Sequence, residues 1–176
     1  MVDLDRLWQE AVRAIRAAFP EAEAPSPTAM RNDHCPECQE TAARFAGKRW
    51  SAIAAGDLLG NPAPGALTAP GFRYYLPAIM LLSMEFPVEL DCLPDGVIGE
   101  LSPMGTSVSA KDAERLRFTQ AQSQAILAFL RFSELRKKLD WAQPDWPDEA
   151  ILGVPTERPR ERAIEFWSAR ASEDAA

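Results

Sequence analysis

The sequence has little histidine and little cysteine, the residues on which many catalytic and disulfide-stabilised proteins depend. Its 176 residues include one histidine and three cysteines. A Ser-His-Asp triad would therefore need His34 together with a distant serine, and no G-x-S-x-G motif is present. A small, odd number of cysteines is unlike a secreted disulfide framework. These absences argue against a hydrolase and favour a reducing compartment, which we expect to be the cytoplasm.

The sequence also has no long apolar run and no excess of positive charge. No segment reaches the roughly 18 apolar residues that a membrane-spanning helix needs, and the first residues carry acids where a signal peptide would be basic and apolar. The formal net charge is -7, which disfavours binding to a phosphate backbone. Neither a phosphate-binding loop with its lysine nor a G-x-G-x-x-G motif occurs. We therefore expect no membrane association and no nucleic-acid partner.

What is present is enough apolar residues for one core, arranged mostly at helical spacing. Hydrophobic residues make up 47% of the chain, and we predict a single helical domain over residues 1–176. The clearest helix spans 3–19, with Asp3 as its N-cap and Pro20 after its end. The residues of its predicted inward stripe recur three and four positions apart: Leu4, Leu7, Trp8, Ala11, Val12, Ile15 and Phe19.

Further helices are predicted from capping residues and apolar periodicity. One should begin within residues 33–37 and end before Gly47, and another should begin after Thr68. Thr119 and Gln122 have the spacing of a capping box, which predicts a helix from there towards residue 139. A last helix is predicted over 158–171.

Prolines and glycines divide these helices and leave one segment open to two interpretations. Fifteen prolines are present, and long proline-rich loops are expected at 20–31 and 61–71. Residues 88–101 hold short β-like runs around a Pro-Asp-Gly sequence. This pattern predicts either a small hairpin or an irregular loop, because a two-stranded hairpin alone is only marginally stable. The expected fold class is mainly α, with this one candidate hairpin.

The segment "NDHCPECQE", residues 32–40, is the stretch most suggestive of chemistry. It contains His34, Cys35, Glu37 and Cys38, so two sulfurs stand at CxxC spacing. A zinc site would need four ligands, and His34, Cys35, Cys38 and Cys92 are the only soft donors in the chain. Adjacent His34 and Cys35 point in different directions, and no second CxxC pair exists. No cofactor is therefore expected, with zinc as the alternative.

A redox interpretation and a packing interpretation of the same segment also stay open. At a helix N-terminus the dipole favours a thiolate, so Cys35 could attack a disulfide and Cys38 could resolve the product. The strand that precedes CxxC in thioredoxin-type folds is not predicted here. Alternatively both cysteines pack as small apolar residues, which is common for free cysteine. Packing is the interpretation that the sequence favours.

A set of short motifs resembles a known group of proteins. "DHCPEC", then "GKRW", then "FRYYLPAIM" resemble a family of small uncharacterised bacterial proteins with a His-Cys-x-x-Cys segment upstream of a Tyr-Tyr-Leu-Pro-Ala helix. The resemblance covers roughly residues 30–135 and implies no activity. It draws attention to Trp50, Tyr74 and Tyr75 as further binding or redox candidates, beside the alternative that they pack in the core.

Two functions follow as hypotheses from these features. The first is a non-catalytic binding or regulatory protein of the bacterial cytoplasm, such as an immunity-like partner that meets a basic protein through its acidic surface. The second is a thiol-redox or zinc protein that uses the HCPEC segment. Another protein is thus the expected partner, and the oligomeric state does not follow from the sequence.

Overall fold

Most helices of this protein lie around one long apolar helix, and two others pack along a second long helix. The computed structural model describes residues 3–30, 36–60, 64–103, 110–141 and 159–172. Its α-helices are α1 (Leu4–Ala18), α2 (Pro27–Met30), α3 (Pro36–Phe45), α4 (Ala55–Leu58), α5 (Ala69–Glu85), α6 (Leu93–Glu100), α7 (Ala110–Arg115), α8 (Gln120–Trp141) and α10 (Pro159–Ser172). Two 3-10 turns, Trp50–Ala52 and Pro64–Ala66, complete the secondary structure of these residues. The prediction of a mainly helical fold is confirmed.

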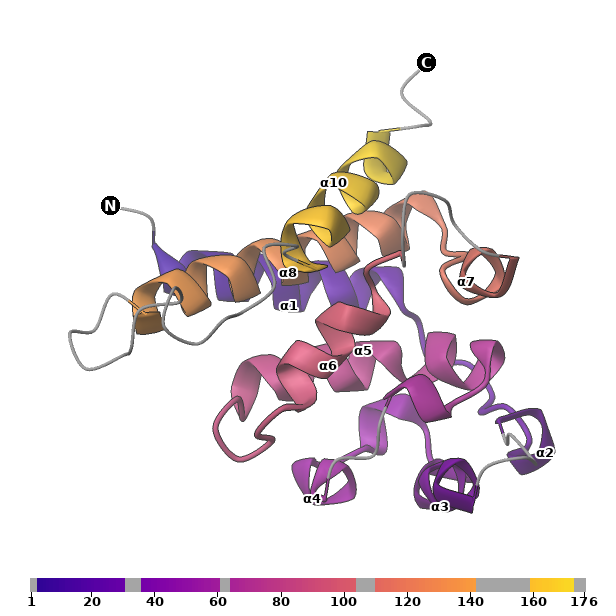
Figure 1. The fold of residues 1–176 in the computed structure, drawn as a ribbon. Helices are drawn as coiled ribbons and strands as arrows, with labels where there is room; N and C mark the ends of the chain where they lie inside the picture. Colours follow the sequence, from indigo (N-terminus) through magenta and orange to yellow (C-terminus); the bar gives the residue numbers. More distant parts are fainter. Residues whose placement is uncertain (1–2, 31–35, 61–63, 104–109, 142–158, 173–176) are drawn as a thin grey trace.

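Helix α8 packs against α1 on one side and α10 on another, and the remaining helices lie around α5 (Figure 1). The capping box predicted at its start is present: the Thr119 N–H donates to Gln122 Oε1 at 3.0 Å, and the Gln122 N–H donates to Thr119 Oγ1 at 3.3 Å. The indole of Trp167 on α10 is fully buried and donates to the Leu101 carbonyl at 2.9 Å. This hydrogen bond attaches α10 to the end of α6, and α10 also packs directly against α8.

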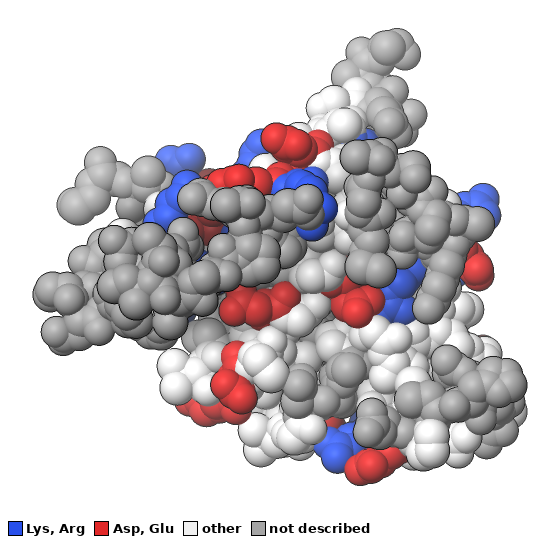
Figure 2. Space-filling model, in the orientation of Figure 1, with Lys and Arg blue, Asp and Glu red and all other residues white. Residues whose placement is uncertain are grey.

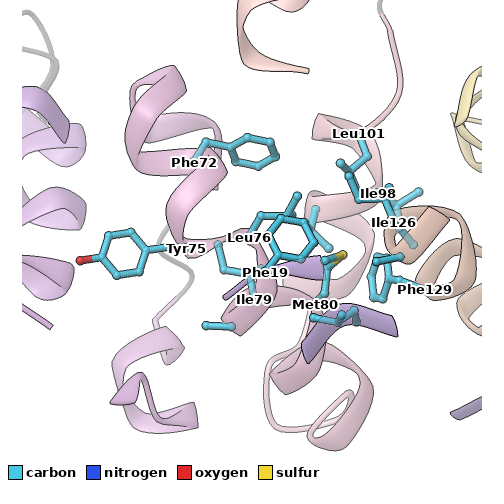
Figure 3. Packing of buried hydrophobic residues seen from close by; sticks show 14 of the residues in the cluster. Phe19, Phe72, Tyr75, Leu76, Ile79, Met80, Ile98, Leu101, Ile126 and Phe129 are labelled. Carbon is cyan, nitrogen blue, oxygen red and sulfur yellow. The ribbon is translucent and has the colours of Figure 1, made fainter. Parts of the chain in front are cut away.

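Helix α5 is buried over most of its length and supplies one side of the core. Its buried residues include Phe72, Tyr75, Leu76, Ile79 and Met80. In Figure 3, Met80 points towards Phe129 of α8, while Tyr75 lies at the far edge of the cluster with its hydroxyl directed away from it. Such all-round burial is expected of an apolar helix at the centre of a bundle. The Tyr75 hydroxyl faces the segment that contains α3.

The hairpin interpretation of residues 88–101 is wrong, because this segment forms turns followed by α6. Pro94 lies in the first turn of α6, where a missing backbone N–H costs nothing, and Asp95 in the same turn favours the helix dipole. The inward residues Leu93, Val97, Ile98 and Leu101 have helical spacing and are buried. Burial of this face against the core therefore outweighs the turn preference of the Pro-Asp-Gly sequence.

Helix α1 forms as predicted, but its apolar stripe is only partly buried. The Asp3 side chain accepts from the Arg6 N–H at 3.2 Å, which confirms the N-cap. Ala11 and Ile15 are fully buried, whereas Trp8 is 38% exposed. The N-terminal half of α1 runs beside the C-terminal half of α8, beyond the end of α5 (Figure 1). The prediction that Trp8 is buried in the core is therefore wrong, because the core does not extend to the N-terminal half of α1.

Candidate functional site

The structure describes only part of the predicted site. His34 and Cys35 lie outside the described residues, as do Asp33, the expected helix cap, and the side chain of Glu37. Cys38 lies in the first turn of α3, which begins at Pro36 as a proline-started helix should. After α3 ends, Gly47 adopts φ 74°, a left-handed conformation that glycine accommodates without strain.

Cys38 is buried and its sulfur takes part in a disulfide bond. Its residue exposure is 9%, and it shares the buried face of α3 with Thr41, Ala42 and Phe45. Cys92, by contrast, has a free thiol and is exposed at the N-cap of α6. A sulfur in a disulfide is not a thiolate, so Cys38 is not available as a zinc ligand in this bonding state. No group of three or more metal-binding side chains occurs among the described residues.

The chain on the N-terminal side of the CxxC segment is fixed to the start of α5. Thr68 donates from its hydroxyl to the Ala29 carbonyl at 2.6 Å and from its backbone N–H to the Met30 carbonyl at 3.2 Å. Met30 is fully buried and packs against Gly71, where an added Cβ would lie 3.2 Å from Met30 Cγ. Glycine at position 71 thus lets α2 approach α5 closely, and these contacts form the first anchor of the segment.

The chain on the C-terminal side is fixed by Tyr75, which forms a second anchor. Its hydroxyl is placed to donate to the carbonyl of Phe45 at 2.7 Å and to that of Lys48 at 2.9 Å, and its ring packs on Phe45 at a centroid distance of 4.8 Å. Burial raises the pKa of Tyr75 to about 12, so the phenol stays protonated and remains a donor. Tyr75 therefore secures the last turn of α3 and the turn that follows it.

Tyr74 and Trp50 extend this second anchor. The Tyr74 hydroxyl donates to the Ala22 carbonyl at 2.8 Å and accepts from the Trp50 backbone, while burial raises the pKa of Tyr74. The Tyr74 ring stands nearly perpendicular to that of Tyr75, with centroids 4.8 Å apart. Trp50 is buried. The three aromatic candidates thus meet beside α3, and their described contacts are those of side chains that hold backbone in place.

Charged side chains stabilise the same end of α3. Arg44 donates to the Leu59 carbonyl at 2.7 Å and pairs with Glu40 at 3.0 Å. Lys48 pairs with Asp57 at 2.6 Å, and this hydrogen bond is the largest cause of the lowered pKa of Asp57. These contacts hold the C-terminal half of α3, while Cys38 and its disulfide lie in the N-terminal half.

A buried arginine that the sequence did not single out lies close to this region. Arg115, at the end of α7, donates to the carbonyls of Pro64 and Leu67, both at 2.7 Å, and pairs with Glu100 at 3.0 Å. Its guanidinium also stacks 3.8 Å from the centroid of Phe72. Nothing in the sequence around Arg115 marks it as buried, because its partners are 15 to 51 residues away.

The charges that Figure 2 shows on one face are mixed rather than gathered by sign. Figure 2 shows acidic and basic side chains interspersed over the described part of the face that it presents. Several described charges form pairs along one helix, such as Arg6 with Glu10 at 2.9 Å. Among the described residues, no helix is both long enough and apolar enough to span a membrane.

Comparison with known families finds a match over most of the chain. The model of a family of unknown function, DUF6714, matches residues 8–171. Neither the comparison with curated proteins nor that with solved structures found a match. The prediction that the chain resembles an uncharacterised family is confirmed at this level.

Proposed function

Because the chain belongs to DUF6714, a family of unknown function, we propose its function from its own site. The protein is a thiol–disulfide protein whose Cys35 and Cys38 pass between a disulfide and a dithiol. The observation that carries this proposal is the disulfide at the buried Cys38. The sequence has three cysteines and Cys92 has a free thiol, so Cys35 is the remaining candidate for the partner.

The short spacing of the two cysteines favours a reactive rather than a stabilising disulfide. Chain-entropy estimates assign about 2 kcal/mol to a disulfide that closes a loop of roughly four residues, compared with about 5 kcal/mol for a loop of 100 residues. A bond that adds so little stability can be broken and reformed without loss of the fold. In a reducing cytoplasm, which is the compartment that we propose, disulfides are usually transient and serve catalysis or redox sensing.

The proposed reaction is exchange with an external dithiol. A thiolate of that dithiol attacks Sγ of Cys35, the bond between Cys35 and Cys38 breaks, and Cys38 leaves with the electron pair and takes up a proton. The second thiol of the reductant then displaces Cys35 from the mixed disulfide. Two electrons and two protons have passed to the protein, and the reductant has become a disulfide. Attack at Cys35 follows from the burial of Cys38.

The position of Cys38 supports its role as the leaving group. It lies in the first turn of the ten-residue helix α3, where the positive end of the helix dipole stabilises a thiolate. The two anchors on α5, through Thr68 and Tyr75, hold the chain on either side of the CxxC segment. We expect the exchange to stay local for this reason.

A redox titration tests this function. The protein is equilibrated in buffers of defined thiol–disulfide ratio, its free thiols are trapped by alkylation, and the Cys92→Ser variant serves as the control. The proposal predicts one reversible two-electron transition, unchanged in that variant, with a midpoint above the roughly −300 mV typical of stable structural disulfides. The proposed function would be refuted if the protein keeps three free thiols in every buffer, or if its disulfide is not reduced in any of them.

A second candidate function is protein binding, and the exposure of Trp8 favours it. Trp8 is 38% exposed in the N-terminal half of α1, and Leu139 is 48% exposed in the C-terminal half of α8. These two halves run side by side (Figure 1). Exposed tryptophans are enriched at interaction sites, and the formal charge of -7 suits a basic partner of a regulatory or immunity-like protein.

A pull-down at low and high salt tests the binding candidate. The Trp8→Ala variant is compared with Leu59→Ala, which removes a similarly exposed side chain at the end of α4. Binding predicts a retained basic protein that is lost at high salt and with Trp8→Ala, but kept with Leu59→Ala. Failure of the wild type to retain any protein at either salt concentration counts against this candidate.

A further inference from the structure

We propose that Arg115 is a positioning residue for the disulfide at Cys38 and makes the reduction potential of that disulfide more negative. The inference rests on the thiol–disulfide function proposed above and adds a residue that tunes the same site from a distance. Arg115 acts through the short turn that precedes α5 and through Thr68, the first anchor of the CxxC segment. Each contact in this chain joins residues that the structure describes.

The guanidinium of Arg115 clamps the 3-10 turn that precedes α5. Arg115 is 6% exposed and donates to the carbonyls of Pro64 and Leu67, both at 2.7 Å. Its rigid fork of donors holds both ends of the turn at once. The same guanidinium pairs with Glu100 at 3.0 Å and lies 3.8 Å from the centroid of the Phe72 ring. The turn is therefore fixed to the end of α6 and to the first turn of α5.

One peptide group connects this clamp to the first anchor. The peptide between Leu67 and Thr68 accepts from Arg115 through its carbonyl oxygen and donates through its N–H to the Met30 carbonyl at 3.2 Å. A peptide group is planar, so fixing its carbonyl also fixes the direction of its N–H. The Thr68 hydroxyl adds a bond to the Ala29 carbonyl at 2.6 Å. Arg115 thus orients the group that holds the chain at the N-terminal side of the CxxC segment.

Loosening this anchor affects the dithiol form more than the disulfide form. The disulfide restricts the segment by itself, whereas in the dithiol form the anchors alone limit its conformational freedom. Loss of the Arg115 clamp therefore adds more conformational entropy to the reduced protein than to the oxidised protein. The equilibrium constant for disulfide formation then falls, and the reduction potential becomes less negative. A purely structural role of Arg115 would destabilise both forms equally and leave the potential unchanged.

A redox titration of Arg115→Lys tests the proposal. Lysine keeps the charge but lacks the fork that holds two carbonyls. Arg160→Lys is the matched control, because Arg160 is also largely buried and pairs with Asp95 at 2.8 Å, but joins α10 to α6. We expect the equilibrium constant for disulfide formation to fall about fivefold or more in Arg115→Lys. Fivefold corresponds to about 20 mV for a two-electron couple. Arg160→Lys should keep the wild-type potential.

Two further measurements keep each outcome decisive. Thr68→Val leaves Arg115 in place, removes only the bond to the Ala29 carbonyl, and should shift the potential in the same direction. In urea unfolding, Arg115→Lys should cost more stability in the oxidised than in the reduced protein, because the coupling is reciprocal. A wild-type potential in both variants, equal costs in the two redox states, or the same shift in Arg160→Lys overturns this proposal and leaves the proposed function standing. Absence of a reversible transition in the wild type overturns both.

Discussion

Reduction of the disulfide at Cys38 should lower the melting temperature of the protein only modestly. With Cys35 as the partner, the bond closes a loop of four residues, for which chain entropy gives about 2 kcal/mol. For a domain of this size, each kcal/mol shifts the melting temperature by roughly 2–4 °C. We therefore expect a decrease of about 4–8 °C on reduction.

The described contacts explain why no larger loss is expected. The Thr68 hydroxyl holds the Ala29 carbonyl, and the Tyr75 hydroxyl holds the Phe45 carbonyl, so both ends of the CxxC segment stay attached to α5. None of these bonds involves a cysteine. Reduction removes one covalent link between the anchors and leaves the anchors in place.

Thermal unfolding followed by circular dichroism provides the measurement. Melts are recorded with and without an excess of a dithiol, and the Cys92→Ser variant is treated in the same way to separate the effect of the third thiol. Unfolding of the reduced protein at room temperature, or a decrease in melting temperature several times larger than expected, would show that the fold depends on the disulfide and would refute this reasoning. If the melting temperature does not decrease at all, the disulfide contributes nothing to the stability of the folded protein.

Other predictions concern single side chains. Trp167→Ala should cost about 3–5 kcal/mol in urea unfolding because the indole is fully buried, whereas Trp8→Ala should cost less than about 1.5 kcal/mol; equal costs would refute the exposure of Trp8. Tyr75→Phe should cost about 1–2 kcal/mol, since the Phe45 and Lys48 carbonyls lose a buried donor, and an unchanged urea midpoint would contradict this anchor. The lowered pKa of Asp57 adds stability that is present above its ordinary value of 3.8 and lost as pH falls through the folded-state value. Asp57→Asn should therefore flatten the pH dependence of stability in acid, and an unaltered acid profile would argue against the pair with Lys48.

The helices could be predicted where local signals and burial agree. The capping residues Asp3 and Thr119 were found because each acts on backbone within its own first turn. The sequence predicts a hairpin or loop where α6 forms, because Pro-Asp-Gly favours a turn while the helical spacing of Leu93, Val97 and Ile98 extends over little more than one turn. Only the core that covers this face decides between the two.

The candidate site was predicted unevenly for related reasons. The CxxC spacing indicates Cys38, but the bonding state of its sulfur depends on how the chain folds. Tyr74 and Tyr75 were noted as a motif, while their roles follow from carbonyls that lie 27 to 52 residues away. The sequence does not indicate that Arg115 is buried, because its hydrogen-bond acceptors are distant in the sequence. Trp8 was misplaced because periodicity gives the face of a helix and not how far the core extends along it.

The pairing of the cysteines can be measured on one tryptic peptide. Cleavage after Arg31 and Arg44 leaves Cys35 and Cys38 together on residues 32–44, while Cys92 lies on another peptide. For protein alkylated without reduction, mass spectrometry should find peptide 32–44 unmodified and lighter by two hydrogen atoms than its reduced form, with Cys92 alkylated. After reduction, both of its cysteines should carry the label, and reoxidation should restore the lighter form. Full labelling of peptide 32–44 even after reoxidation, or a link from either cysteine to Cys92, would contradict the proposed function.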